Sequence, residues 1–307
     1  MGAVLGAALA AAGHHVVGAS AVSAASRARV DRLLPEALVL PVADVPHGVD
    51  LVLLAVPDDA LAPLVRGLAE SGAFGADPER PDRGIGGRVI VVHTSGAHGT
   101  DVLAPAVAAG AAGIALHPAM TFTGHPRDLE RLAEGISFGV TAPEHLRPLA
   151  TRLVADLGGG VEWIDEDARP LYHAALAHGA NHLVTLTNEA LDRLRDAGVL
   201  HPERVLGPLL RAALENTLAH GDAALTGPIA RGDAGTISRH VAVLSQVAPE
   251  SVPAYLALAR RTADRAIASG RLRPVDAEPL LGSLDGHEAR GIGDVVTAPT
   301  STVEIPR

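Results

Sequence analysis

The chain has 307 residues, enough for about two domains, and 48% of them are hydrophobic although only 2% are aromatic. Its formal net charge is −10, and it contains no Cys, no Lys and no basic stripe. These features exclude a disulfide scaffold, thiolate catalysis, Cys–zinc sites and lysine Schiff bases, and they argue against a nucleic-acid partner.

Nothing in the sequence predicts export or a membrane span. The N-terminal run Gly2–Gly13 is apolar, but no Lys or Arg precedes Arg27, so the positive flank of a signal peptide is missing. Elsewhere, Gly and Pro interrupt the apolar runs before they reach the roughly 18 residues that a membrane helix needs. We therefore expect a cytoplasmic protein with no membrane partner.

The first half of the chain alternates short apolar runs with helical patterns. Strands are expected at residues 16–19, 38–40, 49–56, 88–93, 113–116 and 136–140, and helices at residues 26–34 and 58–71. Strands that alternate with helices indicate βαβ units and a mainly parallel sheet. The sequence therefore predicts an α/β Rossmann-type dinucleotide-binding domain over residues 1–165.

The composition changes after Trp163, where Ala and Leu come to dominate. A capping cluster at residues 165–168 precedes a helix that is expected to run to about residue 197, where Gly198 is a natural end. Further helices are expected at residues 202–220, 234–247 and 252–269. We expect an all-helical substrate and dimerisation domain over residues 166–270. The polar, Pro- and Gly-rich residues 271–307 are expected to form a mobile tail.

The N-terminal segment is typical of the helix that follows the glycine loop in a Rossmann unit. Such a helix is built of small residues and presents its N-terminus to a pyrophosphate. Gly2 would be the last glycine of the G-x-G-x-x-G motif, with Gly6 one turn later. The alternative is an apolar helix with no ligand.

The first strand and the first two glycines of that motif are absent from the sequence. We expect the true start to lie upstream by about ten or more residues, the length of a strand and a glycine loop. Because the first strand is normally central, the sheet is expected to have an open slot between unpaired strands.

The segment after the second strand favours NADP(H) over NAD(H). NAD-binding enzymes usually place an Asp or Glu there to hold the ribose hydroxyls. Here Ser20, Ser23 and Arg27 occupy the segment, and hydroxyl and guanidinium groups suit a 2′-phosphate. The alternative is that Arg27 and Arg29 are solvated residues on a surface helix.

Loops after later strands carry further candidates, because ligands bind outside the carboxyl ends of the strands in an open α/β sheet. The cofactor candidates are Ala55, Val56, Pro57, Asp58, Thr94, Ser95 and Gly96, and the substrate candidates are His117 and Pro118. The alternative for all of them is an ordinary strand-to-helix loop.

Several segments together resemble the Rossmann-like proteins that carry a DUF2520 C-terminal domain. These segments are Ala55–Asp58, His93–Ala97, Leu116–Phe122, Leu171–Ala175, Asn181–Leu183 and Thr226–Asp233. That family is similar to pyrroline-5-carboxylate reductase and to the F420-dependent NADP oxidoreductases, and some relatives resemble an alternative ketopantoate reductase. The resemblance covers about Gly2 to Ser269. It implies a dinucleotide cofactor and a homodimer, and says less about the substrate.

The resemblance also shows where the chain departs from related proteins. Related hydroxyacid dehydrogenases use a Lys and an Asn four residues apart on the first helix of the second domain. The corresponding helix here carries His173 and Asn181 instead.

His173, Asn181 and Asn188 are candidates for the substrate site. On an α-helix at about 100° per residue, Asn181 and Asn188 lie about 80° and 60° from His173, so all three share a face. Reduction of a carbonyl needs a donor at the developing alkoxide, and His173 and His117 can hold a proton near neutral pH. Asn181 would then orient the substrate. An imine would arrive already protonated and need only positioning. The alternative is that the three residues on this helix make structural hydrogen bonds between helices.

The segment Arg231–Asp233 offers a second group of substrate candidates. Arg231 can bind a carboxylate with two hydrogen bonds, and Asp233 and His240 follow it closely. The alternative is that Asp233 is simply a helix N-cap. The chain has 15 His but no recognisable metal-ligand spacing, so no metal is expected.

Two classes of function remain open at this point. The first is an NAD(P)H-dependent oxidoreductase that transfers hydride to a small keto or imino acid, with His173, Asn181 and His117 as catalytic residues. The second is a dinucleotide-binding sensor or scaffold without catalysis. Hydride exchange between NADP and coenzyme F420 is a further alternative within the first class.

Overall fold

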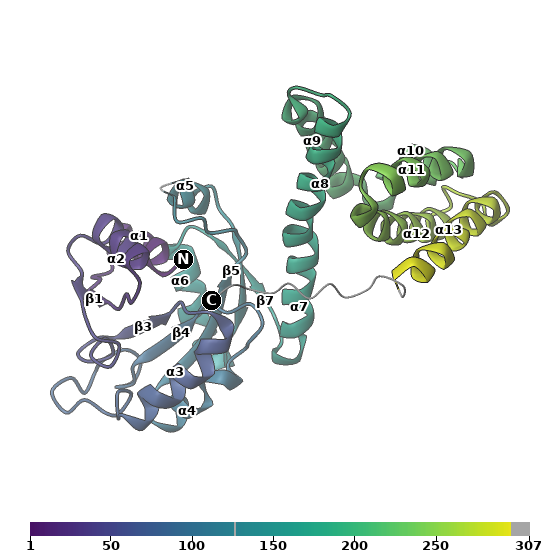
Figure 1. The fold of residues 1–307 in the computed structure, drawn as a ribbon. Helices are drawn as coiled ribbons and strands as arrows, with labels where there is room; N and C mark the ends of the chain where they lie inside the picture. Colours follow the sequence, from purple (N-terminus) through teal and green to yellow (C-terminus); the bar gives the residue numbers. More distant parts are fainter. Residues whose placement is uncertain (126, 296–307) are drawn as a thin grey trace. The chain divides into compact units, whose positions relative to one another are not determined.

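The computed structural model describes residues 1–125 and 127–295 (Figure 1). The contacts divide the chain into two compact units, one from Met1 to Asn181 and one that begins at His182. No helix in the described ranges is long and apolar enough to cross a membrane. The sequence analysis placed this division at residues 165 and 166, before the helix that carries His173.

The first unit is an α/β domain. Its strands are β1 (Gly18–Ala19), β2 (Leu38–Val39), β3 (Leu51–Leu54), β4 (Ile90–His93), β5 (Ala112–Pro118), β6 (Ser137–Thr141) and β7 (Gly160–Trp163). Its α-helices are α1 (Gly2–Ala11), α2 (Ala24–Leu33), α3 (Asp58–Glu70), α4 (Ala104–Ala108), α5 (Arg127–Ala133), α6 (Arg147–Asp156) and α7 (Arg169–Leu176). Short 3-10 helices span Asp101–Leu103, Glu144–Leu146 and Glu166–Ala168, and a π-helical turn spans Ala177–Asn181.

Five of these strands form one sheet in the order β3-β4-β5-β6-β7. β3, β4 and β5 are parallel, β6 runs antiparallel to β5, and β7 is parallel to β6. Helices α1, α5 and α6 cover one face of the sheet and α3 and α4 the other (Figure 1), and their apolar side chains pack against it in two buried clusters. Coverage on both faces explains why all four residues of β4 are buried.

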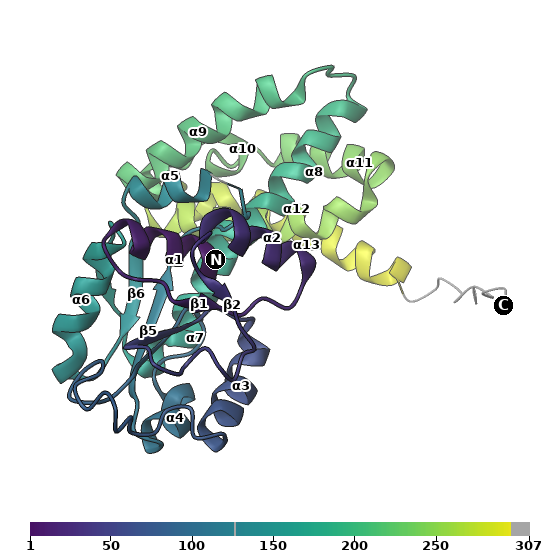
Figure 2. The same cartoon turned by 90° about the vertical axis from the view of Figure 1, so that its left-hand side faces the viewer.

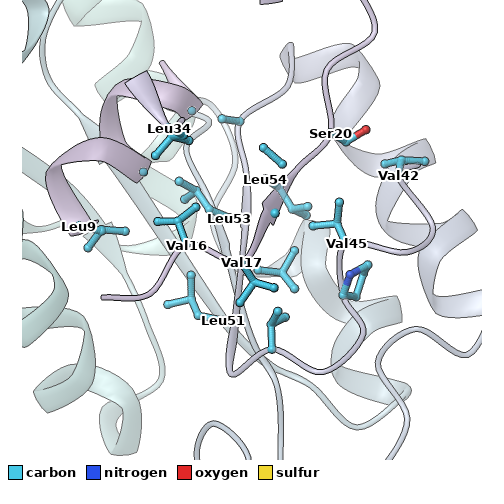
Figure 3. A pocket seen from close by; sticks show the side chains of 18 of the residues that line it. Leu9, Val16, Val17, Ser20, Leu34, Val42, Val45, Leu51, Leu53 and Leu54 are labelled. Atoms are coloured by element: carbon cyan, nitrogen blue, oxygen red, sulfur yellow. The ribbon is translucent and has the colours of Figure 1, made fainter. Parts of the chain in front are cut away.

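β1 and β2 form a separate two-stranded parallel sheet, below α1 and α2 in Figure 2. Among the described residues, neither β1 nor β3 has a partner strand on the side that faces the other. A cavity of about 570 Å³ lies there, and Figure 3 shows around it side chains of α1, of the residues that flank β1, and of β3. Leu51 and Leu53 of β3 point into it and are only half-buried, whereas Val52 and Leu54 are buried against α3. The cavity lies between β1 and β3, at the place where the sequence analysis expects an open slot between unpaired strands.

The second unit is helical. Its α-helices are α8 (His182–Asp196), α9 (Pro202–His220), α10 (Gly227–Ala230), α11 (Ala234–Val247), α12 (Val252–Ala268) and α13 (Pro274–Val295), and its 3-10 helices span Gly221–Ala224 and Pro249–Ser251. Helices α10–α13 contribute to one buried hydrophobic cluster that includes Ile237, Val241, Leu256 and Ala263.

The prediction that residues 271–307 form a mobile tail is wrong for most of that segment. Residues 274–295 form α13, and Ala277, Leu280 and Leu284 are buried in the same cluster as α11 and α12. Their spacing of three and four residues places them on one face of a helix, and burial of that face stabilises the helix. Residues 296–307 lie outside the described range.

Candidate functional site

The carboxyl ends of β4 and β5 bring Gly96 and His117 together, and α7 adds His173. Gly96 is buried in the loop after β4. A Cβ atom placed on Gly96 would lie 2.9 Å from Cδ2 of His173 and 3.0 Å from Nε2 of His117. The two imidazole rings are 6.3 Å apart, centre to centre. Gly96 therefore approaches the edges of both rings as no larger residue could.

His117 is held from behind by residues of α7. Its Nδ1 lies 2.9 Å from the phenolic Oη of Tyr172. The buried Arg169 donates from Nε to the hydroxyl of Thr141 at 2.8 Å and from Nη2 to the carbonyl of Gly139 at 3.0 Å. The guanidinium carbon lies 5.8 Å from the centre of the Tyr172 ring. These contacts fix α7 on β5 and β6, which is the physical reason that α7 belongs to the first unit.

The protonation state of His117 differs from the one expected. Burial, aided by the neighbouring Arg169 and His173 and opposed by Asp58, lowers the pKa of His117 to about 4. The imidazole is therefore neutral near pH 7, and only one of its nitrogens carries a proton. At that pH His117 offers a hydrogen-bond donor and not an imidazolium acid.

The loop after β4 is fastened by His93, the last residue of that strand. Its Nδ1 accepts the backbone N–H of Ser95 at 3.2 Å, so its Nε2 carries the proton and donates to the carbonyl of Gly99 at 2.7 Å. Burial lowers the pKa of His93 to about 4, which keeps this arrangement neutral. The candidates Thr94 and Ser95 are buried in this loop, where they shape the backbone around Gly96.

Glu166 fastens the far end of the same loop. Its carboxylate accepts the backbone N–H of Thr100 at 2.7 Å, the hydroxyl of Thr100 at 3.1 Å and the backbone N–H of Asp101 at 3.2 Å. The loop is thus bonded at one end to β4 and at the other to the turn before α7. Gly96 and His173 owe their proximity to both anchors.

The N-terminus of α2 forms an exposed, hydroxyl-rich and basic corner. Ser23 caps the helix by accepting the backbone N–H of Ser26 at 3.1 Å. Arg29 donates to the hydroxyl of Ser26 at 3.0 Å, and Arg27 donates to a backbone carbonyl of the preceding loop at 3.1 Å. Ser20, Ser23 and Arg27 are all exposed. A helix N-terminus with hydroxyls and two guanidinium groups fits an anion such as a 2′-phosphate.

The two N-terminal glycines have different surroundings. Gly2 approaches the end of β3 so closely that an added Cβ would lie 3.0 Å from Cβ of Ala55. Gly6 is buried against α2, with Leu34 Cδ1 at 3.1 Å from an added Cβ. Helix packing therefore accounts for Gly6 without a ligand, whereas Gly2 marks a close approach of α1 to a strand end.

The remaining candidates of the first unit line the strand ends. Ala55 and Val56 follow β3 and line the cavity, Pro57 is the N-cap of α3, and Asp58 is its first residue. The negative charge of Asp58 acts on the ring of His117, so this helix start lies near the candidate site. Pro118 is buried at the end of β5, and its side chain carries no polar group.

A π-helical turn changes the geometry expected for Asn181 and Asn188. The shared face with His173 assumed α-helical phase throughout, but the turn Ala177–Asn181 has a different number of residues per turn. Asn181 is exposed at the end of this turn, the last residue of the first unit. Asn188 is exposed on α8, within the second unit.

The other substrate candidates belong to the second unit, where two of them have structural partners. Asp233 caps α11 by accepting the N–H of Thr236 at 3.0 Å and its hydroxyl at 2.7 Å. Nδ1 of His240 lies 2.9 Å from Oη of Tyr255. Arg231 is exposed after α10. In the described part of the chain, no group of three or more His, Asp or Glu residues is placed to hold a metal ion.

Sequence reasoning assigned no role to Tyr172, Arg169, Glu166 or His93. Tyr172 stands directly before His173, and Arg169 begins the same helix, so both were within reach of the argument. Their roles depend on partners in β5, β6 and the loop after β4, and local periodicity carries no information on such partners. A polar aromatic next to a candidate catalytic residue was the one available signal.

Comparison with known proteins defines the class to which this architecture belongs. Residues 1–118 match the family described as a Rossmann-like domain, and residues 136–262 match the domain of unknown function DUF2520. The chain therefore combines a Rossmann-like domain with a DUF2520 domain. None of the curated proteins matches its sequence.

Solved structures share the fold at low sequence identity. A Bacteroides fragilis protein described as an NADP oxidoreductase superposes with a TM-score of 0.67 at 20% identity, over 85% of this chain and 93% of its own. An imine reductase of Myxococcus stipitatus in complex with NADP⁺ gives 0.53 at 14%, over 94% and 91%. Pyrroline carboxylate reductase of Plasmodium falciparum with NADP bound gives 0.51 at 11%, over 95% and 94%.

Proposed function

We propose that the protein is an NADP(H)-dependent oxidoreductase that transfers hydride to a small keto or imino acid. The observation that carries this proposal is the convergence of His117 and His173 on Gly96 at the carboxyl ends of β4 and β5. Ligands of open α/β sheets bind at this edge, and the two rings offer donors to an oxygen or nitrogen that gains charge. Asn181 orients the substrate in this proposal.

The preference for NADP(H) rests on the corner at the start of α2. Ser20, Ser23 and Arg27 would hold the 2′-phosphate, with Arg29 adding positive charge. Gly2, Ala55–Asp58 and Thr94–Gly96 would line the rest of the dinucleotide, which supplies the hydride when bound. The proteins of similar fold in complex with NADP or NADP⁺ support the same cofactor class.

The first experiment is a fluorescence titration of the full chain with NADPH and NADH. We expect tighter binding of NADPH, and Arg27→Ala should remove the preference while leaving NADH binding unchanged. Arg66→Ala, an exposed Arg on α3, is the matched control. Equal affinity of the wild type for both nucleotides would contradict the 2′-phosphate assignment.

A turnover screen with ketopantoate, pyrroline carboxylate and coenzyme F420 as hydride acceptors follows. Consumption of NADPH by an organic acid supports the reductase, and consumption by F420 alone assigns hydride exchange between coenzymes. Nucleotide binding without turnover of any acceptor identifies a sensor. His173→Ala should abolish turnover while NADPH binding persists, and unchanged turnover would remove His173 from the site.

We further propose that the second unit pairs two copies of the chain through α8 and α9. Among the described residues of these helices, seven aliphatic side chains are 43% to 79% exposed: Leu183, Val184, Leu186, Val205, Leu209, Leu214 and Leu218. Apolar surface of this extent marks an interface. In a two-fold dimer, the same surface is buried on both partners. Helix α9 carries two Arg and two Glu, so no excess of one charge would repel a second copy.

Light scattering coupled to size exclusion tests this pairing. We expect a dimer for the wild type and a monomer for Leu209→Glu combined with Leu214→Glu. Val275→Glu, at an exposed position of α13, should leave the dimer intact. A wild type that is monomeric at micromolar concentration would overturn the proposal.

A further inference from the structure

We propose that His117, Tyr172 and Arg169 form a proton relay that serves the reduction of a neutral carbonyl and not of a protonated imine. The inference rests on the proposed function and narrows its substrate class. The evidence for the relay is that the three side chains follow one another in space, starting from Gly96. Nε2 of His117 lies next to Gly96, Nδ1 of the same ring lies 2.9 Å from Tyr172, and Arg169 lies behind Tyr172.

The hydrogen bond between Tyr172 and His117 has a direction. Burial raises the pKa of the Tyr172 phenol above its ordinary value, against smaller lowering effects of Arg169 and of the backbone at Gly139. Tyr172 therefore keeps its phenolic proton near pH 7. The phenolic proton is then free to go to Nδ1 of His117. Because the ring is neutral, its own proton is on Nε2, the nitrogen beside Gly96.

Arg169 supplies a buried positive charge to this chain. Its hydrogen-bond acceptors are the hydroxyl of Thr141 and the carbonyls of Gly139 and Ala115, all neutral, and its Nη1 has no partner among the described residues. Its charge lowers the pKa of both Tyr172 and His117. Asp58 and Glu166 are the acids that act on this group of residues, and Glu166 is bonded to the loop at Thr100.

This charge distribution discriminates between the two kinds of substrate. A protonated imine is a cation, and a buried guanidinium raises the energy of a cation placed beside His117. A neutral carbonyl becomes an alkoxide in the reaction, and the same guanidinium lowers the energy of that anion. The site therefore favours a carbonyl over an iminium ion.

The proton balance of the step follows from the geometry. Hydride from NADPH adds to the carbonyl carbon, and the C=O π-bond breaks to give an alkoxide. The oxygen takes the Nε2 proton of His117, and Nδ1 takes the phenolic proton of Tyr172. The resulting phenolate is stabilised by the positive charge of Arg169 until a proton from water restores it. His117 stays neutral throughout, as its low pKa requires.

The resting arrangement is tested without cofactor or substrate. Nitrogen NMR of the full chain with ¹⁵N-histidine reports which nitrogen of His117 is protonated at pH 7, with the signal assigned by His117→Gln. We expect the Nε2–H tautomer, and a mixture of both tautomers in Tyr172→Phe. Tyr255→Phe is the matched control, because Tyr255 and His240 have the same 2.9 Å contact. A wild type protonated on Nδ1 would overturn the relay.

Kinetics test the substrate class. Tyr172→Phe should lower kcat for a carbonyl substrate by about 10²-fold, within the range of general acid catalysis, with KM and NADPH affinity little changed. The wild type should reduce the carbonyl faster than a cyclic imine of the same size. Preference for the imine, or an unchanged kcat in Tyr172→Phe, overturns this inference but leaves the proposed oxidoreductase standing. If NADPH does not bind at all, the proposed function itself fails.

Discussion

Gly96→Ala tests the candidate site directly, because its effect can be estimated from two distances. The added methyl carbon would lie 2.9 Å from His173 and 3.0 Å from His117, whereas ordinary contacts are about 3.5 Å or more. Each ring must therefore retreat by roughly half an ångström. The backbone of Gly96 is not in the left-handed region, so the substitution adds no backbone strain.

A misplacement of 1 Å can cost about 10²-fold in rate, so a retreat of about half that distance predicts a 10- to 30-fold decrease in kcat/KM. This decrease corresponds to about 1.4–2 kcal/mol of transition-state stabilisation. Overpacking should also lower the free energy of unfolding by about 1–3 kcal/mol.

Steady-state turnover with the best acceptor and urea denaturation measure the two effects. Gly67→Ala is the control, since an added Cβ there meets no atom within 4 Å and a helical Gly→Ala change stabilises by up to about 1 kcal/mol. If Gly96→Ala had wild-type kcat/KM, the reaction would not take place between these two rings.

Three further predictions concern stability. Phe138→Ala, at a fully buried position of β6, should lower the free energy of unfolding by about 3–5 kcal/mol in urea denaturation, and a loss below about 1 kcal/mol would contradict the observed core. The pKa values of His93 and His117 are lowered to about 4, so the unfolded chain binds more protons between about pH 6.5 and 4. The free energy of unfolding should therefore decrease as the pH falls from about 6.5 to 4, and it should decrease less in His117→Gln than in the wild type. An equal decrease in both proteins would refute the lowered pKa of His117. Asp128 accepts three hydrogen bonds and its pKa is lowered, so the free energy of unfolding of the wild type should decrease further as the pH falls below the usual Asp range. If the denaturation midpoint of Asp128→Asn depended on acid pH in the same way as that of the wild type, the prediction would be wrong.

The elements that the sequence predicts well are those whose own residues determine them. β3 and β4 are short apolar runs between polar segments, and the predicted helices at residues 202–220 and 234–247 agree with α9 and α11. Asp233 illustrates the same point, because its role as N-cap depends on a residue only three positions away. Local chemistry of this kind is fully contained in a sequence window.

The candidate site was only partly predictable, because its geometry depends on contacts between distant segments. The sequence singled out His117 and His173, which the structure brings together beside Gly96, but the low pKa of His117 arises from its burial beside α7. The sequence gives no sign that Arg169 differs from an ordinary surface Arg, because its hydrogen-bond acceptors lie on the distant strands β5 and β6. The helix α13 was missed because three buried residues with Gly and Pro nearby give only a weak periodic signal.

The small sheet of β1 and β2 has a consequence for local opening of the native chain. The backbone bonds that flank it join Leu38 to Val17 at 3.1 Å and Leu40 to Ala19 at 3.0 Å, and β2 is exposed. A segment with so few protected amides opens at a lower free energy than β3–β7. Its amides should exchange with deuterium first, and the segment should be an early site of proteolytic cleavage. Since β1 leads directly into the corner at Ser23, slower exchange there would report occupancy of that corner even when no reaction takes place.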